Sequence, residues 1–206
     1  ALTGNDEEIR MIRADSINGM GSIYTEIGEY EEAIACYDNL IENYYDVLTD
    51  VGKCKLHVSA IEVYHKIGSV EDYLENAGKL EELLKTVNEE NVLLIGTGYG
   101  VLGQLYFQLG TLDEAKRMLS IGLRRLDGRL PRGHATITTL QAQMRLVEMQ
   151  QTDSPEDLER IRVDLLKVAS EDEGPDAGVY YVQAGNISKN LGEIESAYAY
   201  YKKALS

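Results

Sequence analysis

Residues 21–41 read GSIYTEIGEYEEAIACYDNLI, and versions of this stretch recur along the chain. Gly21 and Tyr24 lie three residues apart, on one face of a predicted first helix. Gly28 follows that helix at a place where only glycine takes a left-handed conformation cheaply. The acidic residues before Ala33 favour the start of a second helix. The stretch therefore predicts a helical hairpin, in which small Gly21 and Ala33 let the two helices approach closely.

Four further copies align with the first on the residue that ends the first helix of each hairpin. These residues are separated by 40, 42, 43 and 39 positions, and they are Gly28, Gly68, Gly110, Asp153 and Gly192. The spacing predicts one domain over residues 1–206 that contains five hairpins. Their approximate bounds are 7–48, 51–88, 90–128, 134–170 and 175–206.

The pattern resembles the tetratricopeptide repeat, in which small residues, aromatic residues and a central glycine recur at fixed places. The third and fifth copies carry it clearly, with Gly103, Tyr106, Gly110, Leu112 and Ala115, and with Gly185, Gly192, Ile194, Ala197 and Tyr201. The second copy departs from it, because large Tyr73 replaces the usual alanine. The resemblance implies an all-α, right-handed superhelical solenoid. The period exceeds the usual ~34 residues, as in the long-repeat variants of bacterial regulators and motor light chains.

The amino-acid composition limits the kinds of partner that the chain can bind. The chain has 20 Lys and Arg against 35 Asp and Glu, a formal charge of −15, so we expect it to repel nucleic acid and anionic membranes. No apolar run approaches the roughly 20 residues that span a bilayer. The two cysteines, Cys36 and Cys54, are too few for a disulfide framework and favour a reducing compartment. We therefore predict a cytoplasmic protein with a protein or peptide partner.

The segment Val92–Gly103 raises an enzymatic alternative, since Gly98, Gly100 and Gly103 form a GxGxxG motif after an apolar run. No strand–helix–strand pattern surrounds the motif, and the repeat register assigns Gly103 to the helix-packing place. A role in helix packing is therefore favoured over a nucleotide site. The remaining glycines, Gly96, Gly98 and Gly100, suggest a bend in the helix or a place where a ligand backbone comes close.

The sequence shows no other constellation typical of catalysis. Cys54 and His57 share a helix face, but no further residues join them at metal-ligand spacing. No Ser/His/Asp or Cys/His arrangement can be recognised. We predict no enzymatic activity, no metal and no cofactor.

The resemblance implies that partners bind in the concave groove lined by the first helices of the hairpins. The family register assigns amide and apolar side chains there, namely Gln104, Phe107, Gln108, Gln143, Met144, Val147, Gln150, Gln183, Asn186 and Asn190. Amides donate to and accept from an extended peptide backbone. The carboxylate clamp of chaperone-binding members is absent, since Asn18 and Ser22 stand at its places.

A second candidate surface is basic. Arg124, Arg125, Arg129 and Arg132 cluster near the end of the third copy, opposed by Asp127. They predict either a solvated face that pairs with neighbouring acids or a docking patch for an acidic partner, including a second copy of this chain.

Two functional hypotheses follow. The first is a non-enzymatic scaffold that binds a protein or peptide segment in the groove. The alternative is the sensory or regulatory segment of a larger bacterial signalling or transcription-regulating protein. Because no capping helix covers the fifth repeat, we also expect either further sequence or a homo-oligomer formed through this repeat.

Overall fold

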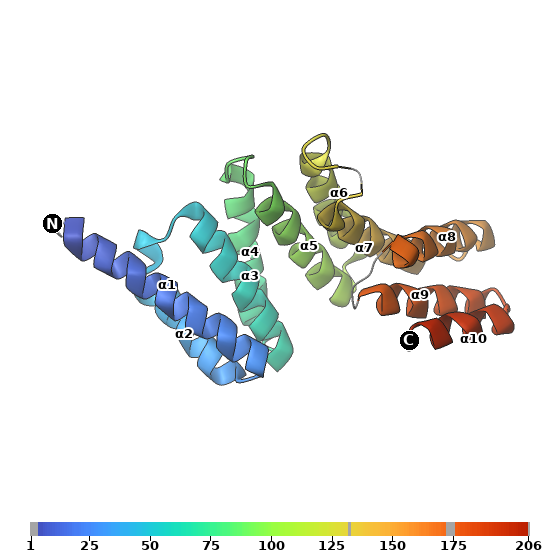
Figure 1. Ribbon diagram of the computed structural model, residues 1–206, viewed down its shortest axis with the longest axis horizontal. Coiled ribbons are helices and arrows are strands. Elements are labelled where there is room, and N and C mark those ends of the chain that lie inside the picture. Colours follow the sequence, from blue (N-terminus) through green and yellow to red (C-terminus); the bar gives the residue numbers. More distant parts are fainter. Residues whose placement is uncertain (1–3, 132, 172–175, 206) are drawn as a thin grey trace. The chain divides into compact units, whose positions relative to one another are not determined.

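The computed structural model describes residues 4–131, 133–171 and 176–205. Figure 1 labels the α-helices that these residues form. They are α1 (Gly4–Ile27), α2 (Tyr30–Asn43), α3 (Asp50–Ile67), α4 (Val70–Thr86), α5 (Val92–Gln108), α6 (Leu112–Leu126), α7 (Ala135–Gln151), α8 (Pro155–Glu171), α9 (Asp176–Asn190) and α10 (Ile194–Lys203). A short 3₁₀ helix, η1 (Tyr45–Val47), follows α2. None of the described helices combines the length and hydropathy that crossing a bilayer requires.

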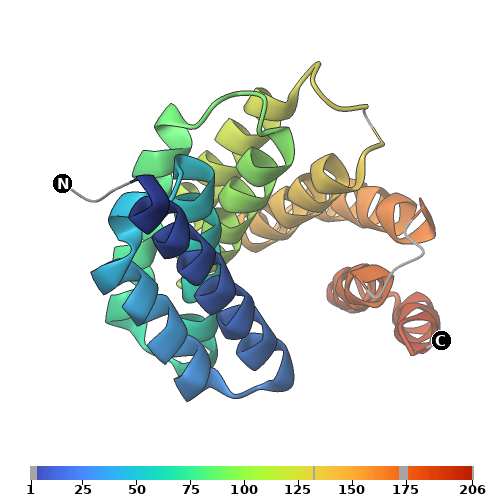
Figure 2. The ribbon, with the colours of Figure 1, turned by 60° about the vertical axis from the view of Figure 1, so that its left-hand side comes forward.

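The chain divides into two compact units, Ala1–Gly98 and Tyr99–Ser206, with the boundary inside α5. In the first unit α1 packs on α2 and α3 packs on α4. In the second unit α6, α7, α8, α9 and α10 pack successively on one another. Figure 2 shows α1 beside α2 and α9 beside α10, each pair joined by a short turn. That residues 1–206 form a single domain stays a prediction.

The turns inside the hairpins have the predicted glycine geometry. Gly28, Gly68, Gly110 and Gly192 have φ of 83°, 76°, 74° and 80°, in the left-handed region. After Gly28, the amide of Glu29 donates to the carbonyl of Tyr24 at 2.9 Å, and the other three glycines are followed by the same bond. This is the Schellman arrangement that satisfies the last carbonyls of a helix.

The fourth hairpin has no glycine at its turn and relies on a side-chain cap. Pro155 is the first residue of α8, and Ser154 Oγ accepts from the amide of Asp157 at 3.3 Å. A serine cap followed by proline at the first helical position is typical of a helix start.

Three hairpins close through a glycine that packs against a large side chain. A Cβ atom added at Gly21 would lie 2.7 Å from the Tyr37 ring, and one at Gly185 would lie 2.6 Å from the Tyr201 ring. At Gly103 the same atom would lie 2.5 Å from Leu119. In each pair the large residue follows the glycine by 16 positions. The absence of a Cβ atom at the glycine therefore leaves room for the facing side chain.

The second hairpin has the sizes exchanged at these two places. Ile61 stands at the glycine place with 3% of its surface exposed, and fully buried Ala77 stands 16 positions later. Tyr73 is also buried, and its ring meets the His65 ring edge-on at 6.0 Å. Because the total volume is conserved, the departure seen in the sequence does not break the hairpin.

The glycine-rich motif lies within a continuous helix. Gly98, Gly100 and Gly103 are all helical residues of α5. A Cβ atom at Gly98 would lie 2.7 Å from Leu84, and one at Gly100 would lie 3.3 Å from Leu140. The glycines thus admit side chains of neighbouring helices, and the strand-to-helix turn of a dinucleotide site is not formed.

A buried histidine ties together the first unit. His57 is fully buried, its Nδ1 lies 2.7 Å from Asn76 Oδ1, and its Nε2 lies 2.9 Å from Tyr45 Oη. An amide oxygen only accepts, so His57 Nδ1 carries the proton and, in the neutral ring, Nε2 accepts from Tyr45. The Cys54 thiol lies nearby in α3 and is also buried, which raises its pKa to about 11. These residues are structural.

We predict opposite effects for two identical substitutions in α1. At Gly19 nothing lies within 4 Å of an added Cβ, so Gly19→Ala should raise the free energy of unfolding by up to about 1 kcal/mol through helix propensity. Gly21→Ala should lower it by about 1–3 kcal/mol, because Tyr37 must move. Urea denaturation of both variants measures the difference, and effects of the same sign would contradict the packing argument.

We also predict that the His57 network makes the protein sensitive to acid. Burial lowers the pKa of His57 below its ordinary value of 6.5. The stabilisation from neutral His57 is therefore complete above pH 6.5 and is lost as the pH falls through the lower pKa of the folded state. Between pH 7 and pH 5 the wild type should lose more unfolding free energy than His57→Gln. Equal losses would show that His57 does not titrate on unfolding.

Candidate functional site

The predicted binding residues lie on the first helices of the hairpins in the second unit. Here we call their surface the amide face. It comprises the half-buried or exposed amides of α5, α7 and α9, namely Gln104, Gln108, Gln143, Gln150, Gln183, Asn186 and Asn190. Half-buried Phe107 and Met144 stand beside them.

Several of these amides are available to a ligand. Gln108, Gln150 and Asn190 are exposed, and Gln104 is half-buried. None of the four side chains forms a hydrogen bond with another residue in the part of the chain that the structure describes. Each therefore offers both a donor and an acceptor.

Gln143 differs from the other amides of this face, because its side-chain oxygen is buried. Its Oε1 atom is buried and accepts no hydrogen bond from any described residue. A Cβ atom added at Gly100 would lie 3.5 Å from this oxygen, so α5 passes close to the amide at this glycine. A buried acceptor without a donor is costly, and a donor that enters from the amide face would relieve that cost.

Two predicted binding amides already have partners within the fifth hairpin. Asn186 Oδ1 accepts from Tyr201 Oη at 2.8 Å, and Asn186 Nδ2 lies 3.3 Å from Gln183 Oε1. This chain of bonds holds α9 against α10. Asn186 and Gln183 thus support the hairpin and are poorer ligand contacts than Asn190.

One assignment to the groove is wrong. Val147 in α7 has only 1% of its surface exposed, so it belongs to the core and offers no surface to a partner. Its register place equals those of Gln104 and Asn186, but an apolar side chain at that place is stabilised by packing inward.

A largely buried cation, Arg162, links α8 to the fifth hairpin. The Arg162 side chain is 11% exposed, and its Nη1 donates to Oγ of buried Ser188 at 2.8 Å. The same guanidinium pairs with Glu159 and with Glu193, the residue before α10. Arg162 therefore fixes the position of α9, which carries part of the amide face.

The predicted basic patch is only partly available. Arg125 is half-buried and lies over the Tyr99 ring, with its Cζ 6.0 Å from the ring centroid. Arg124 and Arg129 are exposed. Arg132 lies outside the described residues.

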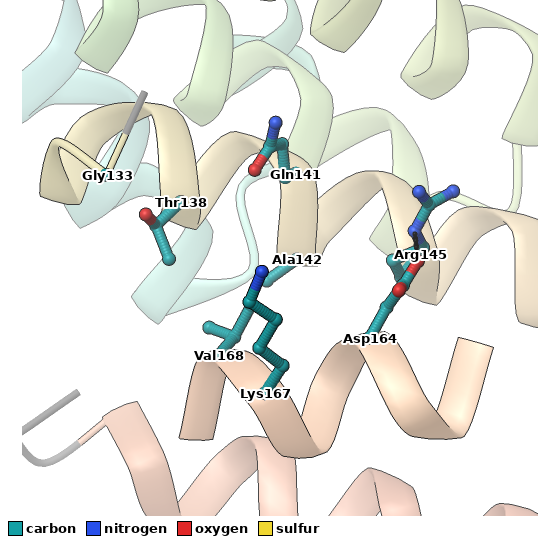
Figure 3. A pocket seen from close by; sticks show the side chains of 8 residues that line it. All are labelled: Gly133, Thr138, Gln141, Ala142, Arg145, Asp164, Lys167 and Val168. Atoms are coloured by element: carbon teal, nitrogen blue, oxygen red, sulfur yellow. Dashed lines mark ion pairs between the residues drawn. The ribbon is translucent and has the colours of Figure 1, made fainter. Parts of the chain in front are cut away.

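Two cavities flank α7 on the side away from the amide face. One, of about 420 Å³, lies between α7 and α8 (Figure 3). The other, of about 730 Å³, lies between α7 and the end of α6. Both are lined by Gln141, which the sequence patterns do not single out. Thr138 and Lys167 also line the first cavity, and no motif marks them because the cavity depends on how closely α7 and α8 approach.

The described residues offer no constellation for metal binding. No three His, Cys, Asp or Glu side chains among them lie close enough to hold an ion. His57 and Cys54, the pair considered from sequence, are buried within the His57 network.

Known proteins resemble this chain in sequence and in structure. The profile of the tetratricopeptide repeat matches residues 14–46, 97–120 and 179–206. The chain contains tetratricopeptide repeats. A comparison with curated protein sequences gives no match.

Solved tetratricopeptide structures share the fold at low sequence identity. A Rap conjugation gene regulator of the plasmid pLS20, solved with the Phr* peptide, superposes with a TM-score of 0.73 at 16% identity. The match covers 99% of this chain and 55% of the regulator, so the chain spans about half of that protein. A Podosopora anserina kinesin light chain with TPR-like repeats gives 0.69 at 14% identity, covering 93% of each chain. A thermophilic TPR protein of Thermus thermophilus gives 0.58 at 19% identity, covering 93% of this chain and 90% of that one.

These likenesses confirm the predicted fold class, an all-α tetratricopeptide solenoid, at identities that show the fold alone. The fold is consistent with a protein-interaction module. Within it, the second, third and fifth hairpins close through the same pair of places, 16 residues apart, as the first.

We predict that Arg162 is required for the stability of this repeat array. Arg162→Ala should lower the unfolding free energy by about 1–3 kcal/mol, because buried Ser188 loses its partner. Arg160 is the matched control, since it is exposed and pairs with Asp157 on its own helix. Arg160→Ala should stay within about 0.5 kcal/mol of the wild type. Thermal or urea unfolding measures both, and equal losses would contradict a special role for Arg162.

Proposed function

We propose that this chain is a non-enzymatic scaffold whose second unit binds an extended peptide segment on the amide face. The observation that carries the proposal is the set of unpartnered amides on α5, α7 and α9. Gln104, Gln150 and Asn190 form no side-chain hydrogen bond within the described part of the chain. Gln143 adds a buried acceptor among them.

Amide side chains suit the backbone of an extended peptide. Such a backbone presents one N–H donor and one C=O acceptor at each residue, and an amide pairs with both. Phe107 and Met144 are half-buried beside the amides and supply apolar contact for the peptide side chains. The peptide therefore contacts the face through its main chain, with selectivity from these two apolar residues.

A second candidate function is that of a regulatory segment in a larger signalling protein. The observation that favours it is the Rap conjugation gene regulator, whose solved complex contains the Phr* peptide and whose fold matches 99% of this chain. Under this second hypothesis the amide face binds a signalling peptide, and an output segment elsewhere in a longer protein responds to the binding.

The experiment starts from random decapeptides displayed on phage and selected on the wild-type chain. Fluorescence anisotropy then measures the affinity of a labelled selected peptide for single variants. Gln104→Ala, Gln150→Ala and Asn190→Ala should each weaken binding by about two- to tenfold, the usual worth of one hydrogen bond.

Gln141→Ala is the matched control, because Gln141 lies on the opposite side of the helix that carries Gln150. It should leave the affinity unchanged. If the amide-face variants fold and bind as tightly as the wild type, or if Gln141→Ala weakens binding more than Gln150→Ala, the proposed site is wrong.

A further inference from the structure

The side of α7 opposite the amide face forms a second surface. At 100° per residue, Thr138, Gln141 and Arg145 share one side of the helix, while Gln143 and Gln150 lie on the other. The two cavities beside α7 are both lined by Gln141, so they adjoin at this residue and are treated together. We call the pair the α7 cleft; the helices α6 and α8 are its two walls. It lies wholly within the second unit.

Arg145 lies at one end of the α7 cleft and already pairs with two carboxylates. Arg145 Nε lies 2.8 Å from Asp164 Oδ2, and Arg145 Nη1 lies 2.5 Å from Glu148 Oε2. Figure 3 shows Arg145 and Asp164 meeting at the end of the cavity away from Gly133. Because two carboxylates already neutralise this guanidinium, Arg145 attracts no further anion and instead holds α7 against α8.

The other cations of the α7 cleft are not neutralised. Lys167 is exposed, and its side chain is directed from α8 toward α7 (Figure 3). Arg124 is exposed on the α6 wall. Neither forms an ion pair with any residue that the structure describes. Among the described residues that line the two cavities, Asp127 is the one carboxylate besides Asp164. Apart from the Arg145 pairs, two cations of the lining therefore stand against one carboxylate, in a chain whose formal charge is −15.

The floor between the two cations is neutral and partly apolar. Leu123 and Ile137 line the cavity near Arg124, and Ala142 and Val168 line the one near Lys167. Gln141 stands between them with an exposed amide. An occupant that matches this lining carries negative charge at both ends and apolar side chains in the middle.

We propose that the α7 cleft binds a short, extended acidic segment of a partner protein, with its terminal carboxylates at Arg124 and Lys167. Packed helices lie about 8–10 Å apart, so α6 and α8 on either side of α7 are at most about 20 Å apart. An extended chain rises about 3.3 Å per residue. About six residues therefore span the cleft, with Gln141 pairing with the backbone of the segment.

Charge favours this occupant over the alternatives. Nucleic acid requires a row of cations along its backbone, whereas the cleft offers two, within a strongly acidic chain. A peptide with acidic ends and an apolar centre places its charges at these two cations and its apolar side chains on the floor between them. This occupant binds on the opposite side of α7 from the peptide proposed for the amide face, so Gln141→Ala and Gln150→Ala distinguish which of the two sites a given peptide occupies.

The test uses the full 206-residue chain and a fluorescein-labelled peptide, Glu-Glu-Leu-Val-Glu-Glu. Anisotropy should show saturable binding that weakens as salt rises. Arg124→Glu and Lys167→Glu should each weaken it about fivefold or more, since each loses an ion pair and gains a repulsion. Lys55→Glu is the matched control, because Lys55 is exposed in the first unit. It changes the net charge equally and should leave binding unchanged, as should Gln150→Ala on the amide face.

Any of three results would overturn the proposal. The first is that the acidic peptide shows no saturable binding. The others are that Lys55→Glu weakens peptide binding as much as Lys167→Glu does, or that the neutral peptide Gln-Gln-Leu-Val-Gln-Gln binds as tightly as the acidic one. Equal binding of hexaglutamate would remove the role of the apolar floor. Sedimentation of the chain alone provides a further test. A concentration-dependent mass that Lys167→Glu abolishes would assign the cleft to a second copy of this chain.

Discussion

The close approach of two helices at one small residue is the constraint on which the remaining structure depends. In the first, third and fifth hairpins a glycine admits a tyrosine or leucine from the facing helix, at distances that leave no room for a Cβ atom. Because the partner comes 16 positions later in each case, one contact fixes both the crossing of the pair and the length of the turn between them. Helix periodicity then sets which side chains of the two helices face each other.

The sequence predicts the hairpins well because their determinants are local. A left-handed glycine, the cap at Ser154 and the start at Pro155 each act within one turn of the chain, and the structure shows all of them. The second hairpin is harder, since Ile61 and Tyr73 look like departures from the pattern. Ile61 and Ala77 are both buried in the structure, which indicates that Ala77 supplies the small residue in the other helix. A repeat pattern lists the residue type at each position, whereas packing depends on the combined volume of the two side chains that face each other.

The candidate site is less predictable, because register gives the direction of a side chain and not its surroundings. Val147 has the register of a groove residue, yet neighbouring helices bury it. Asn186 is half-buried, and Tyr201 already bonds to it. Gln141 and Lys167 became candidates only through the cavities that they line. Such outcomes depend on the spacing of neighbouring helices, which no single hairpin encodes.

The central claim is that an extended peptide pairs with the amide face of the second unit. Side-chain amide resonances of the ¹⁵N-labelled chain report on this contact directly, during titration with a selected peptide. The account predicts saturable shifts in the side-chain NH₂ signals of Gln104, Gln150 and Asn190, with the Gln141 signal unmoved. Shifts at Gln141 with the other three unmoved would contradict it.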